Sequence, residues 1–326
     1  MGGYIIGGAV HERVLAWARA RGYRVAWGPL EAASLAIRDV LDRQTAGQID
    51  RGFFEENLRA LVSFMPNPGV HARVLVVVMP RPAHSVVFET SDRAQTVVIP
   101  PTYVRYTALF EEVACGLREH ALPPGSRLER IDVPLKSLAA RLGLVRYGRN
   151  NLTFDPEAGT SIQLFGYATD APLPLPAGWH PGEPELLPEC ESCPACRDAC
   201  PTGAIGSDRV LLHGERCLTW WNENDRPWPT WLSPDSHHCL VGCLACQDVC
   251  PANARMKVVD TGVVFSAAET TAILNPGQDR SDPVWRSIRA KLDRGVRLNE
   301  EPLIGRNLRA LLASRQAAAV APLRST

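Results

Sequence analysis

This chain of 326 residues has few lysines, no net charge and no long apolar run. It has only three lysines, and its 35 basic residues balance 35 acidic ones, so the formal net charge is zero. A neutral chain has no overall field that would attract nucleic acid. It also lacks an uncharged apolar stretch of about 18 residues, which a membrane-spanning helix requires. We therefore expect no membrane partner.

Signals for export and for nucleotide binding are missing as well. Residues 1–10 have neither the basic segment nor the long apolar stretch of a secretory signal, and no twin-arginine pair is present there. The glycine pairs Gly2-Gly3 and Gly7-Gly8 are not followed by Gly-x-Gly-x-x-Gly or by Lys-Ser/Thr. Phosphate-binding loops need one of these patterns, so nicotinamide binding has no support.

Cysteine, in contrast, is concentrated in one segment, where nine of the ten cysteines lie. The first run is Cys190-x2-Cys193-x2-Cys196-x3-Cys200-Pro201, which is the spacing of bacterial ferredoxins. The second run is Cys243-x2-Cys246-x3-Cys250-Pro251 and repeats the latter half of the first. This spacing predicts two 4Fe-4S clusters rather than a pair of structural zinc sites. A chain with two such clusters transfers single electrons.

Eight ligands are needed, and the sequence leaves the eighth open. The first cluster is assigned Cys190, Cys193, Cys196 and Cys250, and the second is assigned Cys200, Cys243 and Cys246. Cys239 would complete the second cluster only with a step one residue longer than expected. We favour Cys217 and interpret Cys239 as a buried thiol near the cluster. Because cluster thiolates must stay reduced until metal arrives, we expect a cytoplasmic protein.

The His237-His238 pair directly before Cys239 suggests a metal ligand at first sight. The rings of adjacent residues point apart, however, and the cysteines already suffice for two clusters. We therefore assign no histidine to a metal.

The rest of the chain predicts a mixed α+β or α/β fold. The continuous apolar run Val74–Met79 predicts a central strand that is covered on both faces. Further strands are expected over 23–27, 86–88, 96–99, 128–133, 152–154 and 162–167. Helices are expected from Val14 to Gly22 and over 31–43, 53–62, 104–120, 135–142, 267–274, 284–292 and 302–312, with a loose tail beyond Ser314.

Domain boundaries follow from composition. Residues 1–171 read as an α/β domain, and the six prolines within 172–188 indicate a linker or a chain-hugging loop. Residues 189–262 form the predicted double-cluster, ferredoxin-like module, and residues 263–326 the short C-terminal helices.

Several short motifs follow one another between residues 102 and 309. They are Pro134-Leu135-Lys136, Gly143-Leu144, Tyr147-Gly148-Arg149-Asn150, Gly159-Thr160, Thr169-Asp170, the first cysteine run with Pro201 to Ile205, Arg216-Cys217, and Gly242-Cys243 through Cys250-Pro251-x-Asn253. In this order they resemble epoxyqueuosine reductases and their double-cluster relatives, with reductive dehalogenases as more distant kin.

The resemblance implies a cobalamin held in a nitroreductase-like α/β domain, with two 4Fe-4S clusters supplying electrons to its cobalt. The cofactor-binding residues that it implies are Tyr106, Pro134, Lys136, Gly148, Arg149, Asn150, Gly159, Thr160, Thr169 and Asp170. Gly148 would let the backbone approach the flat corrin, while Arg149 and Asn150 would donate hydrogen bonds to corrin amides or a phosphate. Tyr103 and Tyr106 would pack on the corrin or a substrate ring, with ordinary core packing as the alternative.

A proton donor before Pro134 is also implied, since these reductases carry an aspartate a few residues ahead of a proline that begins a helix. Alignment on Pro134 gives Asp132, whereas alignment on Gly143 gives Glu129. Strand alternation would place the two carboxylates on opposite faces, so only one can reach the cofactor. We choose Asp132 as the catalytic residue.

Two functions are consistent with these features. The first is an iron-sulfur, cobalamin-dependent reductase that acts on an epoxide such as epoxyqueuosine or on a carbon–halogen bond. The alternative is a ferredoxin-like electron-transfer protein or a reductive activator of a corrinoid partner. The expected partners are a low-potential electron donor, ferredoxin or flavodoxin, and a small-molecule substrate or a modified tRNA base.

Overall fold

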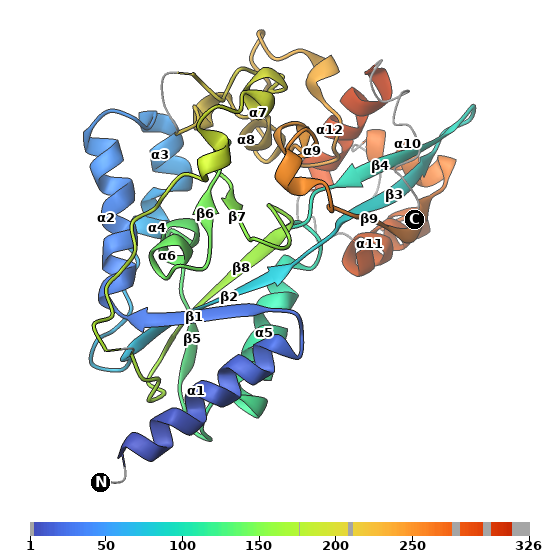
Figure 1. Ribbon diagram of the computed structural model, residues 1–326. Coiled ribbons are helices and arrows are strands. Elements are labelled where there is room, and N and C mark those ends of the chain that lie inside the picture. Colours follow the sequence, from blue (N-terminus) through green and yellow to red (C-terminus); the bar gives the residue numbers. More distant parts are fainter. Residues whose placement is uncertain (1–2, 176, 208–210, 276–280, 296–300, 315–326) are drawn as a thin grey trace. The chain divides into compact units, whose positions relative to one another are not determined.

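A four-stranded sheet and a three-stranded sheet organise the chain in a computed structural model that describes residues 3–175, 177–207, 211–275, 281–295 and 301–314 (Figure 1). The two sheets belong to different compact units. The first unit consists of Met1–Pro80, Thr107–Pro194 and Ser207–Glu215. The second consists of Arg81–Tyr106, Ala195–Gly206 and Arg216–Thr326.

The sheet of the first unit is antiparallel throughout, with the order β1-β2-β8-β5. Its strands are β1 (Arg24–Pro29), β2 (Arg73–Pro80), β8 (Ile162–Thr169) and β5 (Leu128–Arg130). The expected central strand is confirmed, because β2 pairs with β1 on one side and with β8 on the other.

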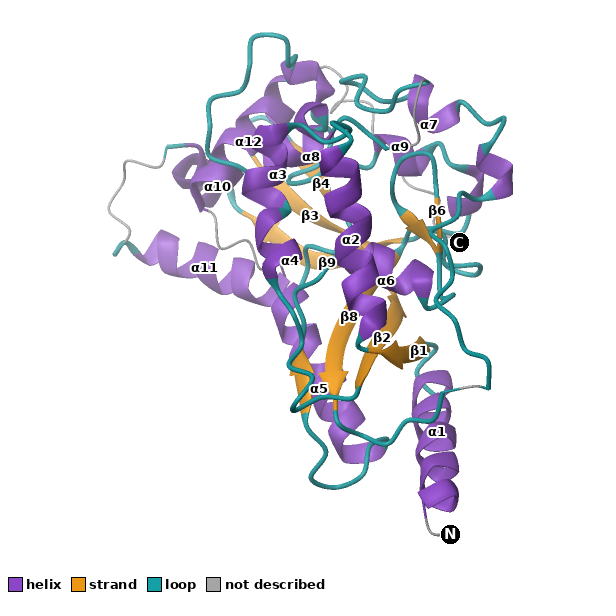
Figure 2. Cartoon of the chain, turned by 90° about the vertical axis from the view of Figure 1, so that its left-hand side faces the viewer, coloured by secondary structure: helices purple, strands orange, loops and turns teal. Residues whose placement is uncertain are grey.

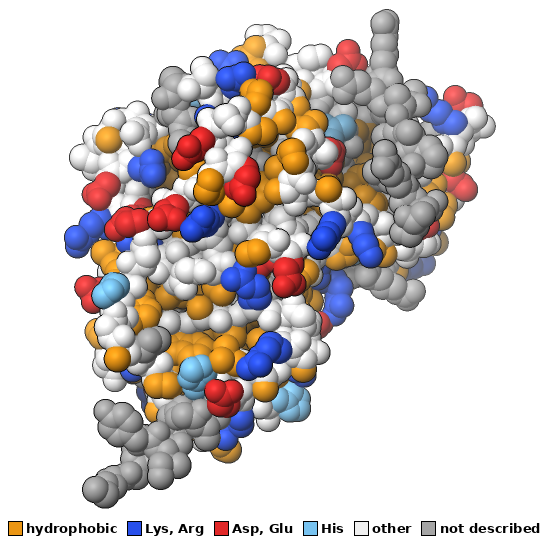
Figure 3. Space-filling view, viewed as in Figure 1, with side chains coloured by type: hydrophobic (Ala, Val, Ile, Leu, Met, Phe, Trp, Pro, Cys, Tyr) orange, Lys and Arg blue, Asp and Glu red, His pale blue; other side chains and the backbone are white. Residues whose placement is uncertain are grey.

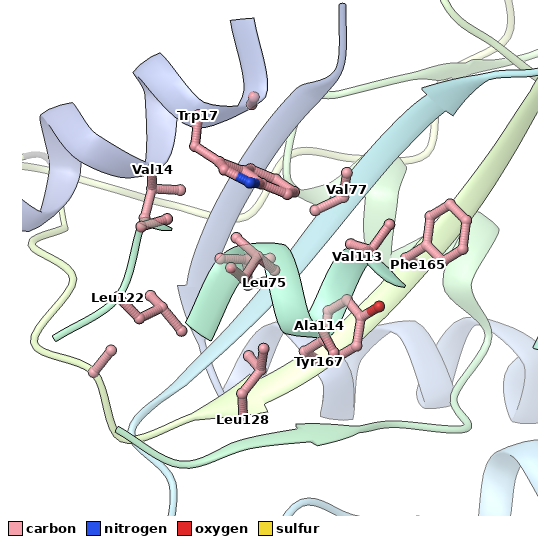
Figure 4. Packing of buried hydrophobic residues seen from close by; sticks show 14 of the residues in the cluster. Val14, Trp17, Leu75, Val77, Val113, Ala114, Leu122, Leu128, Phe165 and Tyr167 are labelled. Carbon is pink, nitrogen blue, oxygen red and sulfur yellow. The ribbon is translucent and has the colours of Figure 1, made fainter. Parts of the chain in front are cut away.

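Helices cover both faces of this sheet. Side chains alternate along β2, so that Leu75, Val77 and Met79 pack with α1 (Gly3–Arg19) and α5 (Tyr106–His120). The intervening valines 74, 76 and 78 pack with α2 (Glu31–Thr45) and α6 (Leu135–Arg141), which lie against each other beside the orange strands in Figure 2. Figure 4 shows the first of these cores, where Trp17 and Val14 of α1 meet Leu75 of β2.

Shorter elements complete the first unit. They are α3 (Arg51–Asn57), α4 (Arg59–Ser63), β6 (Arg146–Tyr147), β7 (Thr153–Phe154) and the 3-10 helix η1 (Pro188–Cys190). The proline-rich segment 172–188 lies against this unit as a chain-hugging loop rather than a free linker. Within it, the Gly182 amide donates to the Arg141 carbonyl at 2.8 Å, and Leu186 forms a bridge with Tyr147.

The second unit is built on a three-stranded sheet of order β4-β3-β9. Its strands are β3 (Ala83–Glu89), β4 (Ala94–Ile99) and β9 (Val258–Phe265), and its helices are α10 (Ala267–Leu274), α11 (Pro283–Gly295) and α12 (Glu301–Ala313). Phe88 and Phe265 stack at 4.6 Å in its core.

The division into units differs from the domain boundaries expected from composition. β3 pairs in parallel with β9, so residues 81–106 belong with the C-terminal part of the chain rather than with residues 1–80. The strand β9 was not expected either. A parallel partner about 170 residues away leaves no local sequence signal.

The cysteine-rich segment contains only short elements. They are α7 (Ala195–Asp198), η2 (Gly214–Arg216), α8 (Leu218–Asn222), η3 (Pro234–Ser236), α9 (Ala245–Asp248) and η4 (Pro251–Asn253). Such short helices bury little apolar surface, as expected where bound metal contributes to folding.

Most other elements match the expectations. The predicted helix 53–62 is divided into α3 and α4 at Leu58, and the predicted strand 128–133 ends at Arg130. The tail beyond Ser314 lies outside the described residues. Within the described ranges, no helix combines the length and apolar character needed to cross a membrane. Among the described residues on the face in Figure 3, acidic and basic side chains are interspersed, in line with the neutral net charge.

Candidate iron-sulfur and cofactor site

Cys190 and Cys193 belong to the first unit, whereas the later cysteines of both runs lie in similar local structures of the second unit. Cys196 lies on α7 and Cys246 on α9, and the two short helices contact each other. Each helix is followed by a cysteine and a proline, Cys200-Pro201 and Cys250-Pro251. The Ala204 amide donates to the Cys200 sulfur at 3.3 Å, a contact that favours a thiolate.

Four thiols assigned to the second cluster influence one another electrostatically. Burial raises the pKa of Cys217, with a further contribution from Cys200. Burial likewise raises the pKa of Cys243 well above its usual value, and Cys239, Cys246 and Cys217 add to that effect. Metal binding displaces thiol protons, and cysteine sulfurs are the donors that a 4Fe-4S cluster requires.

The two candidates for the eighth ligand have different surroundings. The sulfur of Cys217, the residue before α8, accepts hydrogen bonds from the Thr219 hydroxyl and from the backbone amides of Thr219 and Trp220. Cys239 is 1% exposed and packs in an apolar cluster with Ala83 and Val98. Several donors at one sulfur favour a bound thiolate, so Cys217 remains the predicted ligand.

His238 is a neighbour of the second cluster that sequence reasoning did not select. Its Nε2 accepts a hydrogen bond from the Leu244 amide at 3.0 Å and lies 3.7 Å from the Cys243 sulfur. Its Nδ1 lies 3.2 Å from the Ser236 carbonyl and donates to it when Nε2 is the acceptor. The adjacent pair of histidines before Cys239 was the only signal in the sequence, and it did not indicate which ring faces the cysteines.

In the first unit, the motif Gly148-Arg149-Asn150 lies in the turn between β6 and β7. A methyl group on Gly148 would lie 2.3 Å from the Phe154 ring, so only glycine fits there. Asn150 is 3% exposed, and its Oδ1 accepts a hydrogen bond from the Leu152 amide at 3.2 Å. Lys136 of α6 donates to the Asn151 carbonyl at 3.0 Å. The structure thus brings the start of α6, which follows Pro134, to this turn.

Arg149 in the same turn has a different contact from the one expected. Its guanidinium donates through Nε and Nη2 to the backbone carbonyls of Cys190 and Glu191. The residue is therefore joined to the first cysteine of the first cysteine run.

Buried polar side chains gather on β7, on β8 and in the turns before and after β7. They are Asn150, Thr153, Asp155, Thr160, Ser161 and Gln163, each less than a tenth exposed. Gly159 has a φ of 61° and pairs with Asp155, which turns the chain into β8. Among the described residues, the buried Ser161 hydroxyl has no hydrogen-bond partner. A polar cofactor edge beside this hydroxyl would satisfy it, so these side chains fit a group such as a corrin with amide substituents.

Thr169 and Asp170 lie apart from these residues. They are at the other end of β8, about 23 Å from Ile162 by the rise of a strand. The Thr169 hydroxyl donates to the Arg127 carbonyl at 2.6 Å, and Asp170 accepts from the Arg127 amide at 2.8 Å. Their hydrogen bonds fix the loop before β5, which argues against a shared site with Gly148 and Thr160.

The two candidate proton donors both have basic neighbours. Asp132 lies beyond the end of β5, in the loop before α6, and accepts a hydrogen bond from Arg130 at 3.1 Å. Glu129 lies within β5, and its carboxylate is 3.4 Å from Nε2 of the buried His71. Both carboxylates are more than half exposed. Because Asp132 lies outside the strand, the expected alternation between the two does not apply.

Tyr103 and Tyr106 belong to the second unit, and Tyr106 is the first residue of α5. Tyr106 is 37% exposed at the start of the helix. Tyr103 hydrogen-bonds to the Glu223 carboxylate, and its pKa is raised by burial and by the charges of Glu223, Cys217 and Cys239. Tyr103 therefore lies near the thiols of the second cluster.

Comparison with known proteins agrees with the cysteine pattern. Residues 189–253 match the family described as "4Fe-4S double cluster binding domain", which supports two clusters in this segment. An epoxyqueuosine reductase of Staphylococcus aureus is 31% identical over 130 residues, which cover 40% of this chain and 32% of that protein. A solved epoxyqueuosine reductase of Bacillus subtilis superposes with a TM-score of 0.64 at 19% identity, over 94% of this chain and 82% of that one. The chain resembles epoxyqueuosine reductases in sequence and in fold.

The resemblance to epoxyqueuosine reductases covers a smaller part of the chain in sequence than in fold. The sequence match spans about a third of the length of the curated relatives, 32% in the S. aureus protein. The fold match covers most of the chain. A further epoxyqueuosine reductase was solved with a tRNA-Tyr epoxyqueuosine-modified stem loop. It superposes with a TM-score of 0.63 at 19% identity, over 93% of this chain and 80% of that one. The mixed α/β fold is therefore shared, while the more distant reductive dehalogenase resemblance stays a prediction.

Proposed function

We propose that this chain is an iron-sulfur oxidoreductase that passes electrons through two 4Fe-4S clusters to a cobalamin, and from there to an electrophilic substrate. The observation that carries the proposal is the combination of a double-cluster segment, residues 189–253, with a separate group of buried polar side chains on β7 and β8. A plain electron carrier needs only the cluster segment. A second site indicates a second cofactor.

The cluster ligands in this proposal are cysteines alone. Cys190, Cys193, Cys196 and Cys250 would hold the first cluster, and Cys200, Cys217, Cys243 and Cys246 the second. Two clusters in series accept single electrons from an external low-potential donor, ferredoxin or flavodoxin. Burial at Cys217 and Cys243 limits the contact of these sulfurs with water, which would hold a cluster potential low.

Gly148, Asn150, Thr160 and Ser161 are the residues proposed to hold the cobalamin. When bound, cobalamin supplies a reduced cobalt that reacts with electrophilic carbon. Gly148 lets Phe154 and Asn150 pack closely in this turn, and the unpartnered Ser161 hydroxyl gives a donor for a corrin amide. The low exposure of this group would exclude water from the reacting centre.

Asp132 is the proposed proton donor. The B. subtilis relative is described with a catalytic loop that carries an aspartate and swings out of the active site. Asp132 lies in the corresponding kind of segment, a loop before α6, where its carboxylate is exposed and paired with Arg130. A carboxyl group in such a loop would deliver a proton to the reduced substrate from one of its oxygens.

An epoxide, and epoxyqueuosine in tRNA in particular, is the substrate we favour. The support is that curated relatives bear the name epoxyqueuosine reductase and that one relative was solved with an epoxyqueuosine-modified tRNA stem loop. A carbon–halogen bond is the other electrophile consistent with the same chemistry. Both substrates, like the cytoplasmic location, remain proposals.

Corrinoid retention tests this function. The chain is purified without oxygen, mixed with hydroxocobalamin and freed of excess cofactor before its visible spectrum is recorded. We expect one corrinoid per chain, with a spectrum shifted from that of the free cofactor, together with about eight irons. A Ser161→Ala variant is expected to retain less corrinoid and the same iron. Iron near eight without any corrinoid would instead favour a ferredoxin-like carrier or an activator of a corrinoid partner.

A further inference from the structure

Arg149 makes three hydrogen bonds to a segment 41 residues further along the chain. Its Nη2 donates to the Cys190 carbonyl at 2.6 Å and to the Glu191 carbonyl at 3.0 Å, and its Nε donates to the Cys190 carbonyl at 3.1 Å. The side chain is partly buried, and all its acceptors belong to the first unit. One arginine thus holds the backbone at the first ligand of the first cluster.

These carbonyls need donors because they lie at the end of a 3-10 helix. The helix η1 ends at Cys190, and the last carbonyls of a helix have no partner within it. A guanidinium presents several N–H groups in a fixed plane, so one side chain can satisfy two neighbouring carbonyls. Arg149 therefore acts as a side-chain cap for η1.

The backbone next to Arg149 holds the same segment. The Tyr147 amide donates to the Glu185 carbonyl at 2.8 Å, and the Leu187 amide donates to the Tyr147 carbonyl at 2.8 Å. The β6–β7 turn and the chain leading to Cys190 are thus joined on both sides of Gly148. The connection places the cysteine loop beside the turn that contributes Gly148 and Asn150.

We infer that Arg149 is a positioning residue for the first cluster: it fixes the backbone at Cys190 and places a permanent positive charge beside the cluster bound there. The inference rests on the proposed function only in assigning Cys190 to that cluster. A nearby cation stabilises the reduced cluster, which carries one more negative charge than the oxidised cluster. Arg149 therefore raises the reduction potential of the first cluster.

The test compares three variants of the full chain, each purified without oxygen and loaded with iron and sulfide. Arg149→Met removes the charge and the hydrogen bonds, whereas Arg149→Lys keeps the charge but loses the planar fork. Arg146→Met is the matched control, because Arg146 is exposed on the same hairpin and its Nη2 lies 3.4 Å from a carboxylate oxygen of Glu185. The measurements are iron release to a chelator and the potentials of both clusters by EPR-monitored titration.

In Arg149→Met, one cluster is expected to release its iron at least about tenfold faster, since several charge-assisted hydrogen bonds are lost. The same cluster is expected to have a more negative potential, while the other keeps its wild-type values. Arg149→Lys should restore the potential but not the slow iron release. Arg146→Met should match the wild type in both measurements.

Three outcomes would overturn the inference. One is an Arg149→Met protein with wild-type release rates and potentials. Another is an equal change in both clusters, which would indicate a general loss of stability. The third is loss of corrinoid with unchanged clusters, which would make Arg149 a cofactor ligand. Failure of the proposed function is distinguishable, since it appears in the wild-type chain as clusters without corrinoid or as no clusters.

Discussion

Replacement of Cys217 by serine is expected to remove one cluster, whereas replacement of Cys239 is expected to keep both. Two clusters hold about eight irons, so loss of the second leaves about four. The sulfur of Cys217 accepts hydrogen bonds from Thr219 and from the Trp220 amide, and its pKa responds to the nearby Cys200 thiol. A serine hydroxyl binds iron poorly, and the remaining three thiols would not retain the cluster.

Cys239→Ser is expected to lower the unfolding free energy without lowering the iron content. Cys239 is 1% exposed and packs against Ala83, Val98 and Leu244. The Leu244 amide contributes a hydrogen bond at Cys239 but also donates to His238 at 3.0 Å, so a serine hydroxyl would have to share this donor. Burial of a poorly satisfied hydroxyl costs about 1–3 kcal/mol of unfolding free energy.

The assay is iron and acid-labile sulfide per chain after anaerobic loading, with the EPR signal of the reduced protein as a second measurement. The exposed Cys115 on α5 provides a matched control, and Cys115→Ser should keep both clusters. Half the iron in Cys239→Ser together with full iron in Cys217→Ser would refute the reasoning and transfer the eighth position to Cys239.

Three other substitutions have defined outcomes. Asp132→Asn should keep both cofactors but slow turnover about 10²- to 10⁴-fold in steady-state assays. Glu129→Gln should leave turnover unchanged. Equal rates for Asp132→Asn and the wild type would exclude the donor role. Gly148→Ala should lower the unfolding free energy by about 1–3 kcal/mol in denaturant titrations, because its methyl group would lie 2.3 Å from an aromatic carbon. Asp39→Ala should lower the unfolding free energy by about 2–4 kcal/mol in the same titrations, because the 8%-exposed Arg141 side chain loses its nearer carboxylate partner at 2.5 Å and is left with Glu183 at 3.8 Å. An unchanged midpoint would contradict this.

Local signals were sufficient for most of the secondary structure. Pro134 and Gly143 bracket α6 as expected, because proline fits the first turn of a helix and glycine ends it. The apolar run at Val74–Met79 predicted a strand with two covered faces, and β2 is that strand. Both patterns depend on residues close together in the chain.

Pairing between distant segments was not predictable in this way. Residues 81–106 belong to the second unit because β3 pairs with β9, and the sequence of neither strand indicates its partner. Arg149 was assigned to a cofactor by its motif, while its hydrogen bonds run to Cys190 and Glu191. A single sequence specifies the donors of a side chain but not the acceptors that folding brings to it.

The sequence by itself determined the metal chemistry, because cysteines at these fixed short steps are the ligand pattern of 4Fe-4S clusters. Only the tertiary structure decided which polar groups of β7 and β8 are buried together and which residue holds the Cys190 loop. The physical reason is distance along the chain: a turn of ten residues encodes its own shape, whereas contacts between remote segments depend on how the whole unit packs.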